Sequence, residues 1–145
     1  MLVSRFLQNI SVIILFQQTR PNWRKKMDHS ANNHEVNLNH FLEAQEYVWT
    51  DVLIELKNGR KETHWMWFIF PQLLGLGKSP MSIKYAIKNG EHAKAYWNHP
   101  ILGSRLRECF DLVERSGKKP IEIFGDIDTK KYNSCKKLFQ QFTKN

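Results

Sequence analysis

The sequence predicts an all-α protein: a compact single-domain helical bundle with irregular loops and at most one or two short strands. Three observations support this fold class. Apolar residues recur at steps of three and four, which is the period of an amphipathic helix. Residue types that cap or stop helices stand at the ends of these stretches. The chain has 145 residues, of which 41% are hydrophobic, and this is enough for the core of one domain.

The first helix is expected to begin at Asn37 or Asn39, whose side chains can cap a helix start, and to end at Asn58-Gly59. Eight of the nine residues on its predicted buried face are apolar. These nine positions are Leu38, Phe41, Leu42, Gln45, Val48, Trp49, Val52, Leu53 and Leu56. A polar connector over residues 60–63 follows.

An aromatic segment with the sequence HWMWFIFPQ occupies residues 64–72, and its six middle residues are all large and apolar. Periodicity does not distinguish a buried strand from a buried helical turn over so short a length. Pro71 ends the element in either case. Residues 73–78 contain two glycines and are expected to form a loop.

The next helix is expected to start at Ser79, which can cap it, with Pro80 in the first turn. It is expected to continue through Tyr85, Ala86 and Ile87. The pair Asn89-Gly90 marks its end.

Two further helices are expected over residues 91–97 and from about residue 100 to residue 116, where Gly117 ends the second. Residues 120–125 are expected to form an extended link. Asp128 can cap a last helix. The apolar face of that helix consists of Tyr132, Cys135, Leu138, Phe139 and Phe142.

The domain organisation follows from the charge distribution. Residues 1–26 hold five basic residues and no acidic one, and we expect them to be a basic extension outside the domain. A cleaved secretory signal, a mitochondrial transit peptide and a helix packed on the domain are the alternatives. Residues 27–36 form a polar leader, and residues 37–145 form the helical domain.

The net charge of +8 invites a nucleic-acid function. Residues 27–145, however, hold 17 basic and 14 acidic residues and show no basic stripe, so nucleic-acid binding is disfavoured. No apolar run approaches the roughly 20 residues of a membrane-spanning helix. We expect a cytoplasmic protein without a membrane contact.

The histidines and cysteines do not indicate a metal site. His29, His34 and His40 lie in or just after the polar leader and lack an established ligand spacing. Cys109 and Cys135 have no CxxC partner and are expected to be small buried residues with free thiols, as in a reducing compartment. We therefore expect no metal and no cofactor.

Gly77, Lys78 and Ser79 precede a predicted helix start, where backbone N–H groups and a lysine can bind an anion. The segment is not a P-loop, because Gln72 stands where that motif requires a glycine. A helix-capping loop is the favoured interpretation, and an anion site is the alternative.

The favoured functional hypothesis is a pocket for a nucleotide or another phosphorylated metabolite, with aromatic walls and a few polar groups. Its predicted contact residues are Trp65, Trp67, Gln72, Gly77, Lys78, Ser79, Tyr85, His99 and Arg105. Arg105 would bind a carboxylate or phosphate, and His64 or His99 could act as a general acid or base, so catalysis stays open. This hypothesis requires His64, Gln72, His99 and Arg105 to converge on one concavity. The alternative is a non-catalytic protein-interaction module with an exposed aromatic surface.

The motifs over residues 37–139 resemble a family of small proteins known as domain of unknown function 1810, often labelled calpastatin-like. The resemblance rests on FLEAQ at residues 41–45, HWMWFIFPQ at residues 64–72, GLG at residues 75–77, HP at residues 99–100 and IFG at residues 123–125. It implies an all-helical fold in small soluble proteins, and it implies no activity, substrate or cofactor.

Two departures from the family pattern concern the ends of the chain. Family members usually begin near residue 37, so residues 1–26 look added. Members usually continue into a further helical segment, whereas Lys136-Lys137 replace a typical Met-Thr and the chain ends at Asn145. We therefore expect a domain that is truncated at its C-terminus.

Overall fold

The structure is a computed structural model that describes residues 36–143. Within these residues the elements are α2 (Asn39–Lys57), α3 (Met66–Ile69), α4 (Pro80–Lys84), α5 (Gly90–Asn98), α6 (Leu102–Arg115) and α7 (Pro120–Thr143). Strand-like pairing in this part of the chain is limited to one isolated bridge between Leu73 and Ile87. The predicted all-α class is confirmed.

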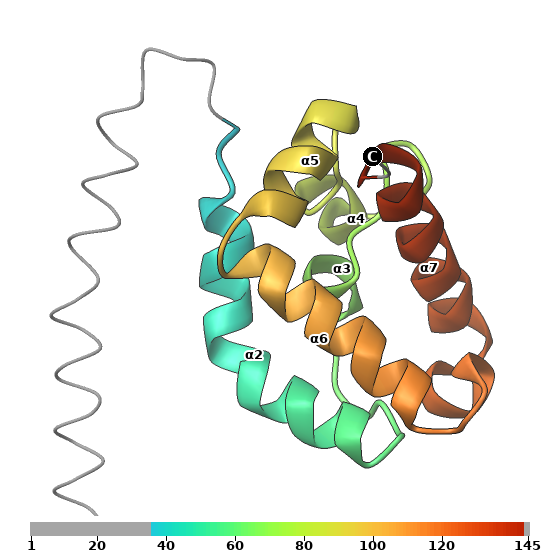
Figure 1. The fold of residues 1–145 in the computed structure, drawn as a ribbon. Coiled ribbons are helices and arrows are strands. Elements are labelled where there is room, and N and C mark those ends of the chain that lie inside the picture. Colours follow the sequence, from blue (N-terminus) through green and yellow to red (C-terminus); the bar gives the residue numbers. More distant parts are fainter. Residues whose placement is uncertain (1–35, 144–145) are drawn as a thin grey trace, which may run out of the picture. The chain divides into compact units, whose positions relative to one another are not determined.

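The helices pack around α3. α2 packs against α3 and α6, and α5 packs against α6 and α7. In Figure 1, α3 and its flanking loops lie between α2 and α7, with α6 crossing in front. The aromatic segment that contains α3 is therefore the centre of the fold, and the long amphipathic helices bury their apolar faces against it.

The predicted extent of the first helix agrees with α2 to within two residues, although its N-cap residue is Leu38, not Asn37 or Asn39, and the Leu38 side chain makes no cap. The side chain of Asn37 accepts a hydrogen bond from the backbone N–H of Asn39 at 3.0 Å. At the other end, Asn58 is the last residue with helical dihedral angles, and Gly59 has a φ of 68°. That left-handed conformation favours glycine and ends the helix.

The aromatic segment forms the single helical turn of α3 and not a strand. Trp65 and Phe70, which flank this turn, are both fully buried. The ring of Phe70 is the hub of an aromatic cluster, with ring centroids between 5.2 and 6.2 Å away. The rings around it belong to Trp65, Phe110, Phe124 and Tyr132.

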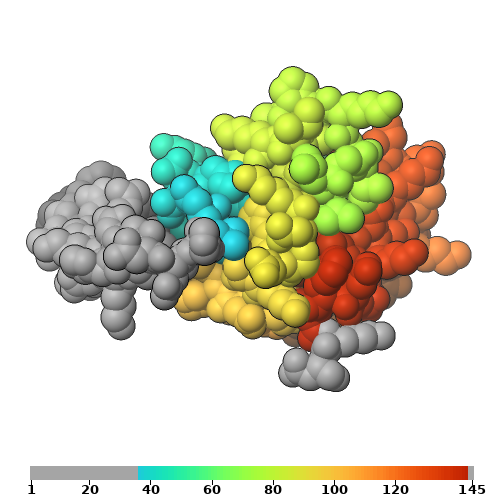
Figure 2. All heavy atoms as spheres, turned by 90° about the horizontal axis from the view of Figure 1, so that it is seen from above, coloured from blue at the N-terminus to red at the C-terminus, as the bar shows by residue number. Residues whose placement is uncertain are grey.

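The predicted extent of the helix that starts at Ser79 was wrong at its C-terminal end. The helix α4 stops at Lys84, and the chain continues in a non-helical link to α5. The backbone N–H of Ile87 donates to the carbonyl of Gln72, and the N–H of Leu74 donates to the carbonyl of Ile87, both at 2.8 Å. This long-range pairing replaces the helical hydrogen bonds that local sequence favours. In Figure 2 the yellow-green segment after α3 projects beside α7, which is red.

The expectations for α5 and α6 are confirmed to within two residues. Asn89 caps α5 by accepting a hydrogen bond from the N–H of His92 at 2.9 Å. α5 and α6 approach each other very closely at Gly103, where a Cβ atom would lie 1.9 Å from the carbonyl oxygen of Trp97. Only glycine fits at this crossing.

Two expectations for the last segment were wrong. Residues 120–125 are the first part of α7 and not an extended link, and the helix is interrupted at Gly125, whose φ is 76°. Asp128 lies inside α7 and does not cap it. Its carboxylate instead pairs with the ammonium of Lys61 at 2.9 Å, which ties α7 to the connector before α3.

The predictions for residues 1–26, the polar leader up to Glu35 and the two terminal residues concern parts of the chain outside the described residues. They stay predictions. Among residues 36–143, no helix is both long enough and apolar enough to cross a membrane.

Candidate functional site

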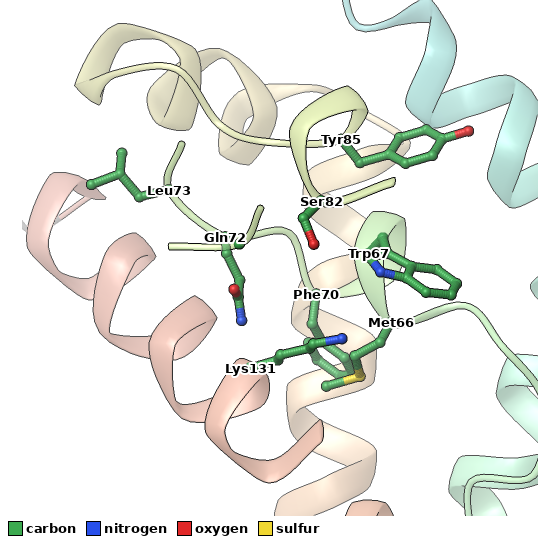
Figure 3. Close-up of a pocket in the computed structure, with 9 residues that line it drawn as sticks. Met66, Trp67, Phe70, Gln72, Leu73, Ser82, Tyr85 and Lys131 are labelled. Atoms are coloured by element: carbon green, nitrogen blue, oxygen red, sulfur yellow. The ribbon is translucent and has the colours of Figure 1, made fainter. Parts of the chain in front are cut away.

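A small pocket lies between the aromatic segment, α4 and α7. Counted out to its open mouth, it holds about 290 Å³ of free space. Figure 3 shows the side chains around it. The residues that line it are Met66, Trp67, Phe70, Gln72, Leu73, Gly77, Ser82, Tyr85 and Lys131.

Three polar side chains from three different parts of the chain point into this pocket. The ammonium of Lys131, the amide of Gln72 and the hydroxyl of Ser82 are turned toward the same space in Figure 3. The Lys131 ammonium lies 5.4 Å from the centre of the Trp67 ring and 3.6 Å from the carboxylate of Asp128. Trp67 is half-buried, so part of its indole surface remains available to a ligand.

Four of the predicted contact residues lie together in this pocket: Trp67, Gln72, Gly77 and Tyr85. The expectation that His64, Gln72, His99 and Arg105 converge on one concavity is not met, because Gln72 is the member of that set that lines the pocket. His64 is exposed on the connector before α3. Trp65, Ser79, His99 and Arg105 have structural partners elsewhere.

Trp65 is a core residue. Its indole N–H donates a hydrogen bond of 2.7 Å to the carboxylate of Glu55. The same carboxylate accepts from the backbone N–H groups of Glu62 and Thr63 and from the Thr63 hydroxyl. Burial alone would raise the pKa of Glu55, but the hydrogen bonds from Trp65, Thr63 and Glu62 outweigh it and lower that pKa.

Ser79 caps α4, because its hydroxyl accepts a hydrogen bond from the N–H of Ser82 at 3.1 Å. The capping interpretation of this loop is therefore confirmed. Lys78 is exposed and is not among the pocket-lining residues.

His99 caps α6 from the preceding loop. Its Nδ1 accepts hydrogen bonds from the N–H groups of Ile101 and Leu102 at 3.1 and 3.2 Å. Burial, and then the positive charge of Arg105, lower the pKa of His99. This buried imidazole is neutral and fixed, and it lies outside the pocket.

Arg105 belongs to a polar network below α2. Its guanidinium donates to the amide oxygen of Gln45 at 3.3 Å and lies 4.8 Å from the ring centre of Trp49. The amide nitrogen of buried Gln45 donates to the carbonyl of Phe68 at 2.8 Å and to the Tyr96 hydroxyl at 3.0 Å. The network positions α3 between α2 and α5.

Comparison with known proteins identifies the family. Over residues 35–145 the sequence matches the family described as "Protein of unknown function (DUF1810)". The chain belongs to this family. It is also similar to a solved structure, that of the conserved hypothetical protein Rv1873 from Mycobacterium tuberculosis, with 47% sequence identity and a TM-score of 0.71. The match covers 72% of this chain and 76% of the other. A search of curated proteins found no match.

The sequence did not indicate every part of the pocket in this DUF1810 protein. Lys131 and Ser82 were missed, because each is a common surface residue type with no motif around it. The nearest signal for Lys131 is the i, i+3 spacing from Asp128 on α7, which is equally typical of an ordinary helix surface.

The cysteines of the DUF1810 domain behave as predicted. Cys109 and Cys135 are free and fully buried, and burial raises the pKa of both thiols. Within residues 36–143 no group of three or more His, Cys, Asp or Glu side chains is arranged to hold a metal ion.

Proposed function

We propose that this DUF1810 domain binds a small anionic metabolite in the pocket beside Trp67. The observation that carries the proposal is the convergence of Lys131, Gln72 and Ser82 on one space next to the half-buried indole. The ammonium supplies a positive charge, and the amide and hydroxyl supply neutral hydrogen-bond donors. A phosphate or carboxylate satisfies all three.

The aromatic walls favour a ligand that also carries a flat group. Trp67 and Tyr85 line the pocket with the apolar side chains of Met66 and Phe70. Flat rings pack well on indole faces, and such packing is worth roughly 1 kcal/mol or more per ring. A nucleotide or another phosphorylated metabolite combines both features.

The size of the pocket restricts the ligand. The free space of about 290 Å³ includes open solvent at the mouth, so the enclosed part is well below the roughly 300–1,000 Å³ of typical small-molecule sites. We therefore expect one small anionic group to enter the pocket while the rest of the ligand lies on the open surface beside Trp67. His64 and His99 do not line the pocket, so the proposal is for binding and contains no acid–base step.

The test is a titration of the full-length protein with a panel of nucleoside monophosphates, sugar phosphates and inorganic phosphate. Binding is monitored by tryptophan fluorescence and by calorimetry. Binding should raise the midpoint of thermal unfolding by mass action. Lys131→Gln should weaken binding by roughly tenfold or more, since a charged hydrogen bond is lost. Lys130→Gln is the matched control, because Lys130 is exposed on the same helix.

Two results would contradict the proposal. One is a panel in which no anionic compound binds. The other is a ligand that binds wild type and the Lys131→Gln variant equally, with circular dichroism showing that both are folded. Either result would leave the pocket as a packing defect next to Trp67.

One observation favours the second candidate function, a protein-interaction module. Leu74, Leu76 and Ile83 lie close together in sequence, and their exposed fractions are 49%, 61% and 56%. Exposed aliphatic side chains on one segment are typical of protein contacts. Replacement of Leu76 and Ile83 by serine should abolish association with a protein partner while the binding of small anions persists.

A further inference from the structure

His92 lies in the first turn of α5. The side chain is buried, with 3% exposed. Its Nδ1 accepts a hydrogen bond from the backbone N–H of Lys88 at 2.9 Å. The backbone N–H of His92 donates to the side-chain oxygen of Asn89, also at 2.9 Å. Its Nε2 has no hydrogen-bond partner among residues 36–143. The arrangement resembles a capping box in which a histidine supplies the returning side chain.

The peptide that His92 holds is continuous with the pocket wall. Lys88 follows Ile87, whose N–H and carbonyl pair with Gln72 and Leu74. The bridge between Leu73 and Ile87 joins the two segments that carry Gln72, Leu73 and Tyr85, all of which line the pocket. The hydrogen bond to His92 is therefore one residue away from the pairing that shapes this wall.

The hydrogen bond requires a neutral imidazole. Because Nδ1 accepts from Lys88, the proton of the neutral ring is on Nε2. A second proton can be added only at Nδ1, and it converts the acceptor into a donor that faces another donor. Protonation therefore breaks the bond between α5 and the link that precedes it.

The surroundings of His92 oppose a positive charge. The groups that act on it electrostatically are His40 of α2 and Lys88 of the link, and α6 and α7 contribute none among the described residues. The ring of Phe41 presents an edge to it at 6.2 Å. His40 is in turn influenced by Lys84, Lys88 and Glu43, and it stacks on the pocket residue Tyr85 at 5.7 Å.

We propose that His92 is a proton-operated latch on the pocket: in its neutral form it fixes the link between α4 and α5, and on protonation it releases the link together with the wall formed by Tyr85, Gln72 and Leu73. The latch is a property of the fold. Its consequence for ligand binding rests on the proposed function of the pocket.

The direction of the response follows from linkage. Burial, and then the charges of His40 and Lys88, lower the pKa of His92 to about 4, whereas a released histidine titrates near 6.5. Opening therefore takes up a proton, and it becomes more favourable as the pH falls from about 6.5 toward 4.

The test measures amide hydrogen exchange in the ligand-free, full-length protein. Protection factors are followed for the N–H groups of Leu74, Ile87 and Lys88, with amides of α6 as a reference for global unfolding. Between about pH 7 and pH 5, protection of the three amides should fall roughly tenfold or more while protection in α6 is retained, because opening is coupled to the uptake of one proton.

A non-titrating variant identifies the group responsible. In His92→Asn the amide oxygen can replace Nδ1 as the acceptor, so the protection of the three amides should become independent of pH. His64→Asn is the control, since His64 is exposed, and it should respond as wild type does. The proposal is overturned if wild type shows no selective loss of protection, or if His92→Asn keeps the same pH dependence.

A direct titration covers the case in which the variant fails to fold. The imidazole carbon resonances of His92 in wild type should report the Nε2–H tautomer at neutral pH, and the ring in the closed state should titrate well below pH 6.5, near 4. A His92 ring that titrates near pH 6.5 in the closed state overturns the proposal. Because these readouts contain no ligand, failure of the proposed ligand site would leave them unchanged.

Discussion

The carboxylate of Glu55 on α2 accepts a hydrogen bond of 2.7 Å from the indole N–H of Trp65, the residue that leads into α3. Both side chains are buried. The same carboxylate accepts hydrogen bonds from the backbone N–H groups of Glu62 and Thr63, in the connector before α3. This one buried anion therefore fixes the position from which the aromatic segment enters the core.

Replacement of Glu55 by glutamine should destabilise the fold by about 2–3 kcal/mol. The new amide group turns a donor toward N–H and O–H groups that have no other acceptor. Urea unfolding followed by circular dichroism measures the loss. Asp51→Asn, at an exposed position of the same helix, should change stability by less than about 0.5 kcal/mol. Equal stabilities of the two variants would contradict the role of Glu55.

Gly103→Ala should be more damaging than its small size suggests. The added methyl group would lie 1.9 Å from the carbonyl oxygen of Trp97, so α5 and α6 would have to move apart. We expect a loss of about 3 kcal/mol or more. The neighbouring exposed substitution Ser104→Ala is the control. Thermal unfolding of both variants provides the measurement, and an unchanged midpoint for Gly103→Ala would disprove the close contact.

Stability should decrease in acid partly because of His99. Its pKa is lowered in the folded protein, so the unfolded chain binds more protons as the pH falls below about 6.5. The stability that the neutral cap supplies is present above this pH and is lost below it. His99→Asn keeps an acceptor for α6 and does not titrate. Urea unfolding at about pH 7.5 and pH 5 should show a smaller loss for this variant than for wild type. Equal losses would exclude His99 as the cause.

Cys109 and Cys135 should resist an aromatic disulfide reagent in the native protein. Both side chains are fully buried, and burial raises the pKa of both thiols, whereas the thiolate is the reactive form. Addition of denaturant should release both thiols to rapid reaction. Fast labelling of either thiol under native conditions would show that α6 and α7 separate readily.

The sequence predicted helices well where nearby residues alone determine the ends and the apolar face of the helix. The hydrogen bond between Asn37 and Asn39, the stop at Gly59 and the apolar face of α2 each depend on residues only a few positions apart. The C-terminal end of α4 could not be predicted this way, because Ile87 pairs with Gln72 in a distant part of the chain. Residues 120–125 were expected to form an extended link, yet this stretch is helical up to Gly125.

The candidate site was predicted only in part, because some of its residues are close in sequence and others are distant. Trp67 and Gln72 belong to the aromatic segment and Tyr85 follows the next short helix, so all three are close in sequence. Lys131 comes from α7, and no local pattern connects it with Trp67. His99 and Arg105 were expected to contact a ligand, but the structure uses them to cap α6 and to bind Gln45. A capping histidine and a ligand-binding histidine have the same appearance in a sequence.

The pairing between Leu73 and Ile87 also bears on how this family can diversify. It closes the chain around the loop and α4, where Leu74, Leu76 and Ile83 are exposed, while Tyr85 and Ala86 return to the core. Insertions or deletions near Leu76 can therefore change the rim of the pocket without disturbing the core. Relatives that share the Trp-rich centre can therefore differ in this one segment while they keep the same core.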